Sequence, residues 1–329
     1  MISDKDIQLF ENIRTLINRN KTFLLIAHVD PDGDCVGSML SFAALLEKMG
    51  KEVGCYIPGG VSEKYKKFSR LESILSEEDI NRFKFEAVFV LDTPTLERAG
   101  GIITHEKDAV IVNIDHHPTN MRFGSINYIK DKTASTTILV YHFLSFAYSE
   151  SITPEIADYL YLGIVTDTGC FRFQNTDAEA LSVASELIGY GARASEITRE
   201  FFYMKKFRSV KLLSCVLANL QLFEDGKVAV MELTNSMLDE FNAELEDTEG
   251  FIDYAGSIEG VELTAFLREI NTKRVRASLR SLGDLDVSSL AERYGGGGHK
   301  NAAGLTFDHG LERSRELVID GFRQILVKL

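Results

Sequence analysis

Short apolar runs alternate with amphipathic stretches through the first half of the chain. The runs cover residues 22–27, 53–57, 87–91 and 109–114. Each is apolar almost throughout, which is typical of strands in a parallel sheet covered on both faces. Residues 33–49 place apolar side chains at helical spacing, and Gly50 follows as a helix stop. We therefore expect an α/β doubly wound unit that extends to about residue 190.

A different pattern follows in the second half. Residues 220–233 and 261–280 have the pattern of two hairpins, which turn near Asp225-Gly226 and Asn271-Thr272. After them come a predicted helix (286–294), a glycine loop, a strand (304–308) and a last amphipathic helix (310–328). This order predicts a smaller α+β domain with a mixed sheet. The expected division is a first domain over 1–190, a helical linker over 191–215 and a second domain over 216–329.

Composition narrows the class of protein. The 329 residues are 45% hydrophobic, and the net charge of −13 disfavours a broad basic surface for long nucleic acid. The four cysteines lie far apart without a CxxC pair, which disfavours a zinc ribbon and a disulfide framework. No apolar run approaches the roughly 20 residues that span a membrane, and the first residues are charged rather than signal-like. We expect a cytoplasmic protein without a membrane partner.

Acidic and imidazole side chains follow three of the predicted strands. They are His28, Asp30, Asp32 and Asp34 after the first run, Asp92 after the third, and Asp115, His116 and His117 after the fourth. A helix that begins at Thr153-Pro154 ends near Asp167. A lone aspartate after a strand is most often a cap or turn residue. Together, however, these side chains collect at one sheet edge, and a set of this size and chemistry suits two divalent ions that share a carboxylate.

Four segments resemble the DHH phosphoesterase superfamily. They are "HVDPDGD" (28–34), "LDT" (91–93), "DHH" (115–117) and "GIVTDTGCFRFQNT" (163–176). One such segment alone would be weak evidence, whereas four in order are specific. The resemblance covers essentially the whole chain, and it implies a metal-dependent phosphoesterase.

By position, the resemblance implies how the metals are held. The first ion would take His28, Asp32 and Asp92, and the second would take Asp34, Asp92, His116 and Asp167. His117 would face the substrate phosphate and assist the leaving group, and Asp115 would orient the histidines. Asp30 is not counted as a ligand. Two divalent ions, with Mn²⁺ expected ahead of Mg²⁺ or Co²⁺, would activate a water for attack on phosphorus.

A glycine run and an arginine-bearing strand distinguish the second domain. The run "RYGGGGHKNAAG" (293–304) is either a flexible linker or a loop whose backbone N–H groups approach an anion. Strand alternation places Arg274, Arg276, Ser278 and Arg280 on one face, and Glu262, Thr264, Phe266 and Arg268 share a face of the preceding strand. Charged strands are often simply solvated, but arginine suits phosphate, and Phe266 beside Arg268 would offer a surface for a base.

The resemblance assigns substrate contacts within these segments. The implied residues are Arg280 in "SLRS", then Arg268, and the loop residues Gly296, Gly297, Gly298 and His299. The implied activity removes mononucleotides from oligonucleotides of about two to five nucleotides and dephosphorylates 3′-phosphoadenosine-5′-phosphate (PAP) to AMP. Expected partners are short oligonucleotides, the dinucleotide pApA or PAP, with no long nucleic acid. The sequence leaves open whether the protein forms a homodimer.

Three alternatives remain. A cyclic-dinucleotide or pApA phosphodiesterase would use the same chemistry. A manganese pyrophosphatase is disfavoured because its second domain lacks the glycine run. A nucleotide-sensing module without catalysis is disfavoured by the intact ligand set.

Overall fold

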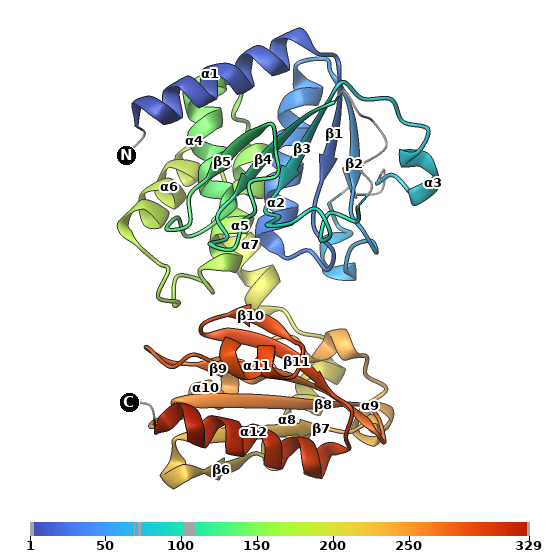
Figure 1. Cartoon of the computed structure of the whole chain (residues 1–329), viewed down its shortest axis with the longest axis vertical. Helices are drawn as coiled ribbons and strands as arrows, with labels where there is room; N and C mark the ends of the chain where they lie inside the picture. Colours follow the sequence, from blue (N-terminus) through green and yellow to red (C-terminus); the bar gives the residue numbers. More distant parts are fainter. Residues whose placement is uncertain (1–2, 69, 72–73, 102–108, 328–329) are drawn as a thin grey trace. The chain divides into compact units, whose positions relative to one another are not determined.

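The chain divides into two units, Met1–Met204 and Lys205–Leu329 (Figure 1). The computed structural model describes residues 3–68, 70–71, 74–101 and 109–327. The division falls inside the segment expected to link the domains. Within the described ranges, no helix is both long enough and apolar enough to cross a membrane.

A sheet of five parallel strands forms the centre of the first unit, in the order β2-β1-β3-β4-β5. The strands are β1 (Thr22–Ile26), β2 (Glu52–Tyr56), β3 (Ala87–Leu91), β4 (Val110–Asp115) and β5 (Ile126–Ile129). The strand order reverses between β1 and β3, and such a reversal opens a crevice at the carboxyl ends of the strands. The segments that follow β1, β3 and β4 therefore meet at one edge of the sheet.

Long helices cover one face of this sheet (Figure 1). They are α1 (Asp4–Arg19), α2 (Gly33–Lys48), α4 (Thr136–Tyr148) and α5 (Pro154–Asp167), with α6 (Ala178–Gly189) packed on α5. Phe23 and Phe89 point toward these helices, whereas their neighbours Leu24 and Val88 point to the other face. That face contacts the short α3 (Glu77–Ile80) and loop residues. The predicted α/β class is confirmed, with the helices distributed unequally.

Glycines bring α2, α4 and α5 unusually close together. A Cβ on Gly37 of α2 would collide with the backbone oxygen of Tyr159 in α5. A Cβ on Gly163 of α5 would collide with Thr137 and would lie 2.7 Å from Asp34 Oδ1. Because these positions lack side chains, the three helices can approach closely, and Asp34 of α2 lies beside Thr137 of α4 and Gly163 of α5.

A mixed sheet of six strands forms the centre of the second unit, in the order β10-β11-β9-β8-β7-β6. The strands are β6 (Gln221–Phe223), β7 (Val228–Leu233), β8 (Leu263–Asn271), β9 (Arg274–Ser281), β10 (Gly297–His299) and β11 (Ala302–Phe307). Neighbours pair antiparallel except β7 and β8, which pair parallel. Both predicted hairpins are therefore present.

Helices pack on both faces of this second sheet. One face carries Ala277 and Leu305 and is covered by α11 (Ser288–Arg293) and α12 (Leu311–Leu326). The other face contacts α8 (Phe207–Ala218) and α10 (Phe251–Gly256) at β7 and β8, with α9 (Asn235–Phe241) packed nearby. The remaining helical segments are α7 (Ala194–Thr198), the π-helical η5 (Arg199–Tyr203), and the short η1 (Glu63–Tyr65), η4 (Ser149–Ser151), η6 (Glu224–Gly226) and η7 (Leu245–Thr248).

Two details of the second unit differ from the sequence expectation. Part of the glycine run is the strand β10, because Gly298 at φ 147° leaves its backbone free to pair closely with Ala303. Phe266 does not offer a surface to a base. Its side chain is only 3% exposed, since the ring of Phe251 from α10 packs against it with centroids 6.1 Å apart.

Candidate metal centre

Asp92 lies at the centre of the acidic and imidazole cluster. It directly follows β3, adopts a left-handed backbone (φ 53°) and is 1% exposed. Its Oδ2 lies 3.7 Å from Nε2 of His28, and its Oδ1 lies 3.7 Å from Nε2 of His116 and 3.5 Å from Nδ1 of His117. One carboxylate therefore faces histidines on both sides, as a carboxylate shared between two ions must.

The Nε2 atoms of His28 and His116 face the carboxylates. Nδ1 of His28 is 2.7 Å from the carbonyl oxygen of Val29, and Nδ1 of His116 is 3.0 Å from that of Thr133. Because a carbonyl oxygen only accepts, Nδ1 of His116 carries a hydrogen, whereas Nδ1 of His28 also lies 3.1 Å from a guanidinium nitrogen of Arg98, which only donates. Each Nε2 can therefore face its carboxylate oxygen in two ways: it carries a proton, as in the hydrogen bond from His28 to Asp92, or it shares a metal ion with that oxygen.

Asp34 joins the cluster from the first turn of α2. Its carboxylate accepts hydrogen bonds from the backbone N–H groups of Thr136 (2.6 Å) and Thr137 (2.8 Å), at the start of α4. Ser135, the N-cap residue of α4, makes no capping bond through its own side chain. Asp34 therefore caps α4 from a different helix, and its Oδ2 lies 3.9 Å from Nε2 of His116.

Asp167 ends α5 beside the same imidazole. Its Oδ2 lies 3.4 Å from Nε2 of His116, a distance that allows both atoms to bind one ion. This oxygen is buried and, among the described residues, has no hydrogen-bond partner. An orphaned buried carboxylate oxygen is costly unless a cation satisfies it. The donor set therefore fits divalent metal.

Burial sets the charge balance of the three carboxyl groups. Burial, together with the neighbouring charge of Asp92, raises the pKa of Asp34 to about 7. Burial and the proximity of Asp34 likewise raise the pKa of Asp167. Burial also opposes ionisation of Asp92, but a hydrogen bond from His28 and the charges of His117 and His116 outweigh it and lower the pKa of Asp92 to about 2. Full ionisation of all three groups requires added positive charge.

Asp32 lies at the edge of the cluster. It is the N-cap of α2, and its Oδ1 accepts from the backbone N–H groups of Asp34 and Cys35, each at 3.0 Å. Its side chain is exposed, and it does not join the groups of ligand atoms that lie within 4.8 Å of one another among the described residues. In the structure Asp32 thus caps the N-terminus of α2. Its role as a metal ligand stays a prediction.

Cys35 was not expected at the site. Its thiol lies with His28 and Asp92 in one of the three tight groups of ligand atoms found among the described residues, and its Sγ accepts from the backbone N–H of His28 at 3.3 Å. Burial raises the pKa of this thiol to about 12, so it remains protonated at neutral pH. In the sequence Cys35 was one of four widely separated cysteines without a metal-binding pair, whereas the structure places it in the first turn of α2, beside His28 and Asp92.

His117 is held by a second layer of polar residues. Its Nδ1 lies 2.7 Å from Oδ1 of Asp115, and the same oxygen accepts from the backbone N–H groups of His116 and His117. The other oxygen of Asp115 accepts from Asn120 at 2.6 Å, and Asn120 also donates to Asn113 Oδ1 at 2.8 Å. This buried network fixes the imidazole of His117 and the hydrogen on Nδ1. Sequence reasoning missed Asn120 and Asn113.

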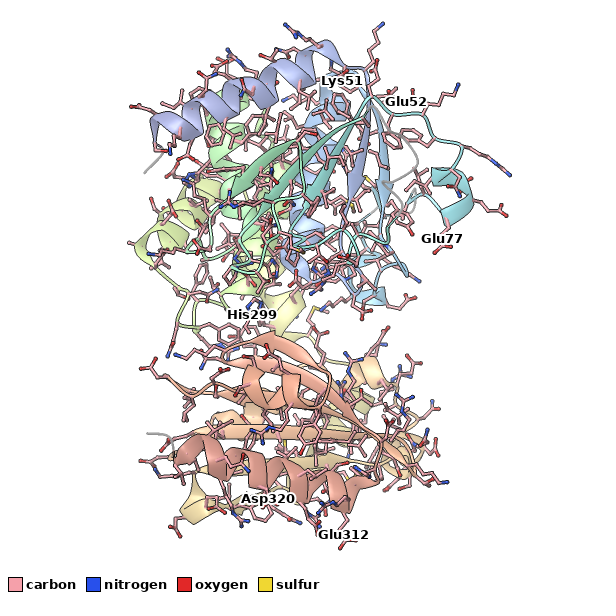
Figure 2. The ribbon with its side chains drawn as sticks, viewed as in Figure 1. Lys51, Glu52, Glu77, His299, Glu312 and Asp320 are labelled. Atoms are coloured by element: carbon pink, nitrogen blue, oxygen red, sulfur yellow. The ribbon has the colours of Figure 1, made fainter. Side chains whose placement is uncertain are left out.

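The residues expected to contact substrate in the second unit share one face of its sheet. Cross-strand pairing places Arg280 opposite Thr264, and Arg268 opposite Arg276. Burial lowers the pKa of both Arg280 and Arg268, and Arg268 donates to Ser278 at 3.3 Å. At the end of the sheet, His299 (labelled in Figure 2) pairs with Ala302, which is itself the partner of Arg280.

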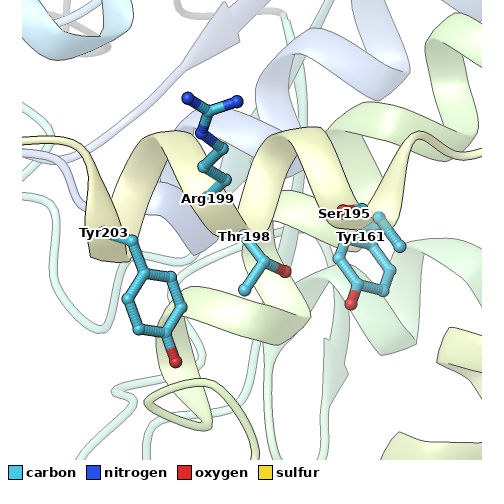
Figure 3. Close-up of a pocket in the computed structure, with 6 residues that line it drawn as sticks. Tyr161, Ser195, Thr198, Arg199 and Tyr203 are labelled. Carbon is cyan, nitrogen blue, oxygen red and sulfur yellow. The ribbon is translucent and has the colours of Figure 1, made fainter.

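A separate hollow of about 320 Å³ lies beside α5 and the α7–η5 segment (Figure 3). It is lined by Tyr161, Ala194, Ser195, Thr198, Arg199 and Tyr203. None of these six is among the residues singled out in the sequence. None belongs to the groups of ligand atoms found in the described part of the chain, so the metal centre remains the chemical site of the first unit.

This chain resembles known proteins over most of its length. Residues 22–164 match the DHH family, N-terminal domain, and residues 225–328 match the DHHA1 domain. The chain is 32% identical over 308 residues to the bifunctional oligoribonuclease and PAP phosphatase NrnA of Thermus thermophilus, a match that covers 92% of this chain and 90% of that protein. The chain belongs to the DHH family. The resemblance drawn from the four segments is confirmed.

Two further proteins resemble the chain over nearly its full length. The protein of the same name from Bacillus subtilis is 30% identical over 298 residues, which cover 90% of this chain and 92% of that protein. The crystal structure of an exopolyphosphatase-related protein from Bacteroides fragilis aligns with a TM-score of 0.90 at 28% identity, covering 98% of this chain and 96% of that one. The fold is therefore shared with that structure over nearly the whole length of both chains.

Proposed function

We propose that this DHH-family phosphoesterase removes mononucleotides from oligonucleotides of about two to five nucleotides and dephosphorylates PAP to AMP. The observation that carries the proposal is the Asp92-centred cluster, in which imidazole nitrogens and buried carboxylate oxygens face one another at 3.4–3.9 Å. Divalent ions bound there would replace the protons that otherwise balance these charges. The relatives named as oligoribonuclease and PAP phosphatase support the choice of substrate.

The residues of the first unit have distinct proposed roles. His28, Asp32 and Asp92 would hold one divalent ion, and Asp34, Asp92, His116 and Asp167 would hold the other, with Mn²⁺ preferred over Mg²⁺ or Co²⁺. Ions bound there supply positive charge that lowers the pKa of a water nucleophile and stabilises the phosphoryl oxygens. His117 carries its Nδ1 hydrogen toward Asp115, and it would contact the phosphate or the leaving group through Nε2.

The second unit is proposed to bind the rest of the nucleotide. Arg280 and Arg268 offer guanidinium groups suited to phosphate. Gly296, Gly297 and Gly298 have no side chains to keep an anion from their backbone N–H groups. His299 pairs with Ala302 on β11, and Ala302 pairs with Arg280 on β9. Because burial already lowers the pKa of Arg280, its charge is poorly hydrated and gains more from an anion.

A substrate panel tests the proposed function. Initial rates with Mn²⁺ should be highest on RNA dinucleotides, pApA and PAP, and low on longer RNA and pyrophosphate. Cyclic di-AMP as the best substrate would favour the alternative phosphodiesterase. Asp92→Asn keeps the size of the side chain but removes the shared charge, and it should abolish turnover and reduce bound Mn²⁺. Near wild-type turnover by this variant would contradict the two-ion arrangement.

A further inference from the structure

Phe173 is an exposed aromatic side chain close to the metal centre. It lies six residues beyond Asp167 and is 47% exposed. Its ring packs on Gly169, which is only two residues from Asp167 and therefore within about 7 Å of it along the chain. Single exposed apolar side chains are common on proteins, so it is the position of Phe173 beside the metal centre that distinguishes it.

One face of the Phe173 ring is covered and the other is open. If Gly169 carried a Cβ, that atom would lie at nearly equal distances from Cζ, Cε1 and Cε2 of the ring, the largest being 2.6 Å. A point so close to three ring atoms at once lies above the flat face of the ring, since a point beyond its edge would be much nearer to Cζ. Gly169 therefore backs one face, and the exposed surface belongs to the rest of the ring.

The loop that carries this ring is held in a defined shape. Gly169, Cys170 and Phe171 are consecutive left-handed residues (φ 55°, 60° and 61°), a conformation that residues other than glycine rarely adopt. The backbone N–H of Phe173 donates to the carbonyl of Thr168 at 3.0 Å. Asn175 donates to the carbonyls of Ala134 and Asp167 at 3.1 and 3.0 Å. The backbone that carries the ring is thus tied to Asp167.

We propose that the open face of Phe173 stacks on a base of the nucleotide whose phosphate lies at the metal centre. The inference rests on the proposed function and adds the residue that recognises the base. A flat, rigid aromatic face accepts any base, because every base presents a π-face. Phe266, which the sequence suggested for this role, is buried. Phe173 has the exposure that stacking requires, and it belongs to the unit that holds the reacting phosphate.

The experiment compares substrates with and without a base. Phe173→Ala should raise KM for pApA roughly 5- to 150-fold, as expected for the loss of one stacked base. The same variant should not change KM or kcat on the matching dinucleotide in which both bases are absent. Phe173→Tyr should restore the wild-type KM, because it keeps the aromatic face. Equal losses on both substrates, or no loss on either, would overturn the proposal.

A binding measurement separates this inference from the proposed activity. The chain contains no tryptophan, so Phe173→Trp introduces a single reporter. Titration with AMP should quench its fluorescence saturably, whereas ribose 5-phosphate should not. Phe207→Trp, at a phenylalanine that is 77% exposed in the second unit, is the matched control and should show no saturable quenching. A wild-type enzyme inactive on every nucleotide would refute the proposed function, and absent quenching at Phe173→Trp would refute the stacking itself.

Discussion

At the scale of single residues, Asp115 acts on His117 only because it is itself held. One of its oxygens accepts from the imidazole, and the other accepts from Asn120. Asn113 anchors the far side of the network by donating to the carbonyls of Val90 and Thr93. Partners of this kind, one step behind the reacting groups, typically change activity by roughly 10–100-fold when removed.

Asn120→Ala should therefore lower kcat roughly 10- to 100-fold with KM within about twofold of the wild type. The reason is that an unsupported Asp115 carboxylate rotates away from Nδ1 of His117, while the groups that bind the nucleotide are unchanged. Steady-state kinetics on pApA and the Mn²⁺ content measure both quantities. Asn81→Ala, at an exposed asparagine after α3, is the control. A variant that raises KM alone would show that Asn120 acts on binding instead.

Arg280→Ala tests whether the second unit binds the nucleotide through this guanidinium. Loss of a charged hydrogen-bond partner for phosphate should raise KM for dinucleotides roughly 10- to 150-fold, with bound Mn²⁺ unchanged because the ligands lie in the first unit. Arg274→Ala removes a guanidinium from the same strand face, where Arg274 is exposed and paired with Asp308 at 3.1 Å. It should leave KM unaltered. Equal KM values for both variants would count against a specific role for Arg280.

At the scale of elements, the metal centre depends on how closely α2, α4 and α5 approach one another. Gly163 has no room for a side chain, because a Cβ there would meet Thr137 and Asp34. Asp34 in turn caps α4 through Thr136 and Thr137. The stability of the helix layer and the position of a proposed ligand are therefore coupled.

Gly163→Ala should lower the free energy of unfolding by roughly 1–3 kcal/mol, as overpacking does, and should weaken Mn²⁺ binding by displacing Asp34. Urea unfolding and metal titration measure the two effects. Gly189→Ala is the matched control, since a Cβ at this helical position would meet no atom within 4 Å. It should be neutral or stabilising by about 0.4–1 kcal/mol. A neutral Gly163→Ala would mean that the helices can separate without cost.

The sequence predicted elements where a pattern is local and strong. β1 and β3 lie at unbroken apolar runs, and α5 begins at the predicted Thr153 cap, whose side chain accepts from Ile156. β5 escaped prediction because its four residues are mostly half-buried and show no apolar run. β10 escaped because glycines carry no side-chain pattern, so only its pairing with β11 reveals a strand.

The candidate site was predictable in part for the same reason. The predicted strand ends were enough to place His28, Asp92 and His116 at one edge of the first sheet, although they gave no distances between these side chains. The capping of α4 by Asp34 joins residues about 100 positions apart, and no local pattern encodes such a partner. Phe266 shows the opposite failure. Alternation assigned it to a face correctly, but it could not tell that Phe251 covers that face.

At the scale of the whole molecule, the metal centre links stability to pH. An acid with a raised folded pKa contributes its stability below the ordinary pKa and loses it as the pH rises through the folded value. Asp34 and Asp167 are such acids. Burial alone would lower the pKa of His116, but Asp92 and Asp34 outweigh it and raise the pKa. A histidine with a raised pKa also loses its contribution to stability as the pH rises. Asp34, Asp167 and His116 therefore all make the folded state less stable at higher pH.

Without metal, the first unit should therefore be less stable at pH 8 than at pH 5.5. Asp34 alone accounts for roughly 2 kcal/mol of this loss as the pH rises from 5.5 through about 7. Thermal unfolding in EDTA across this range should show a falling Tm for the first unit, and saturating Mn²⁺ should remove the trend because the cation replaces the protons. The second unit has its own core and none of the proposed ligands, so it serves as the internal control. A metal-free first unit as stable at pH 8 as at pH 5.5 would mean that its carboxylates ionise without help and that the cluster does not need bound cations.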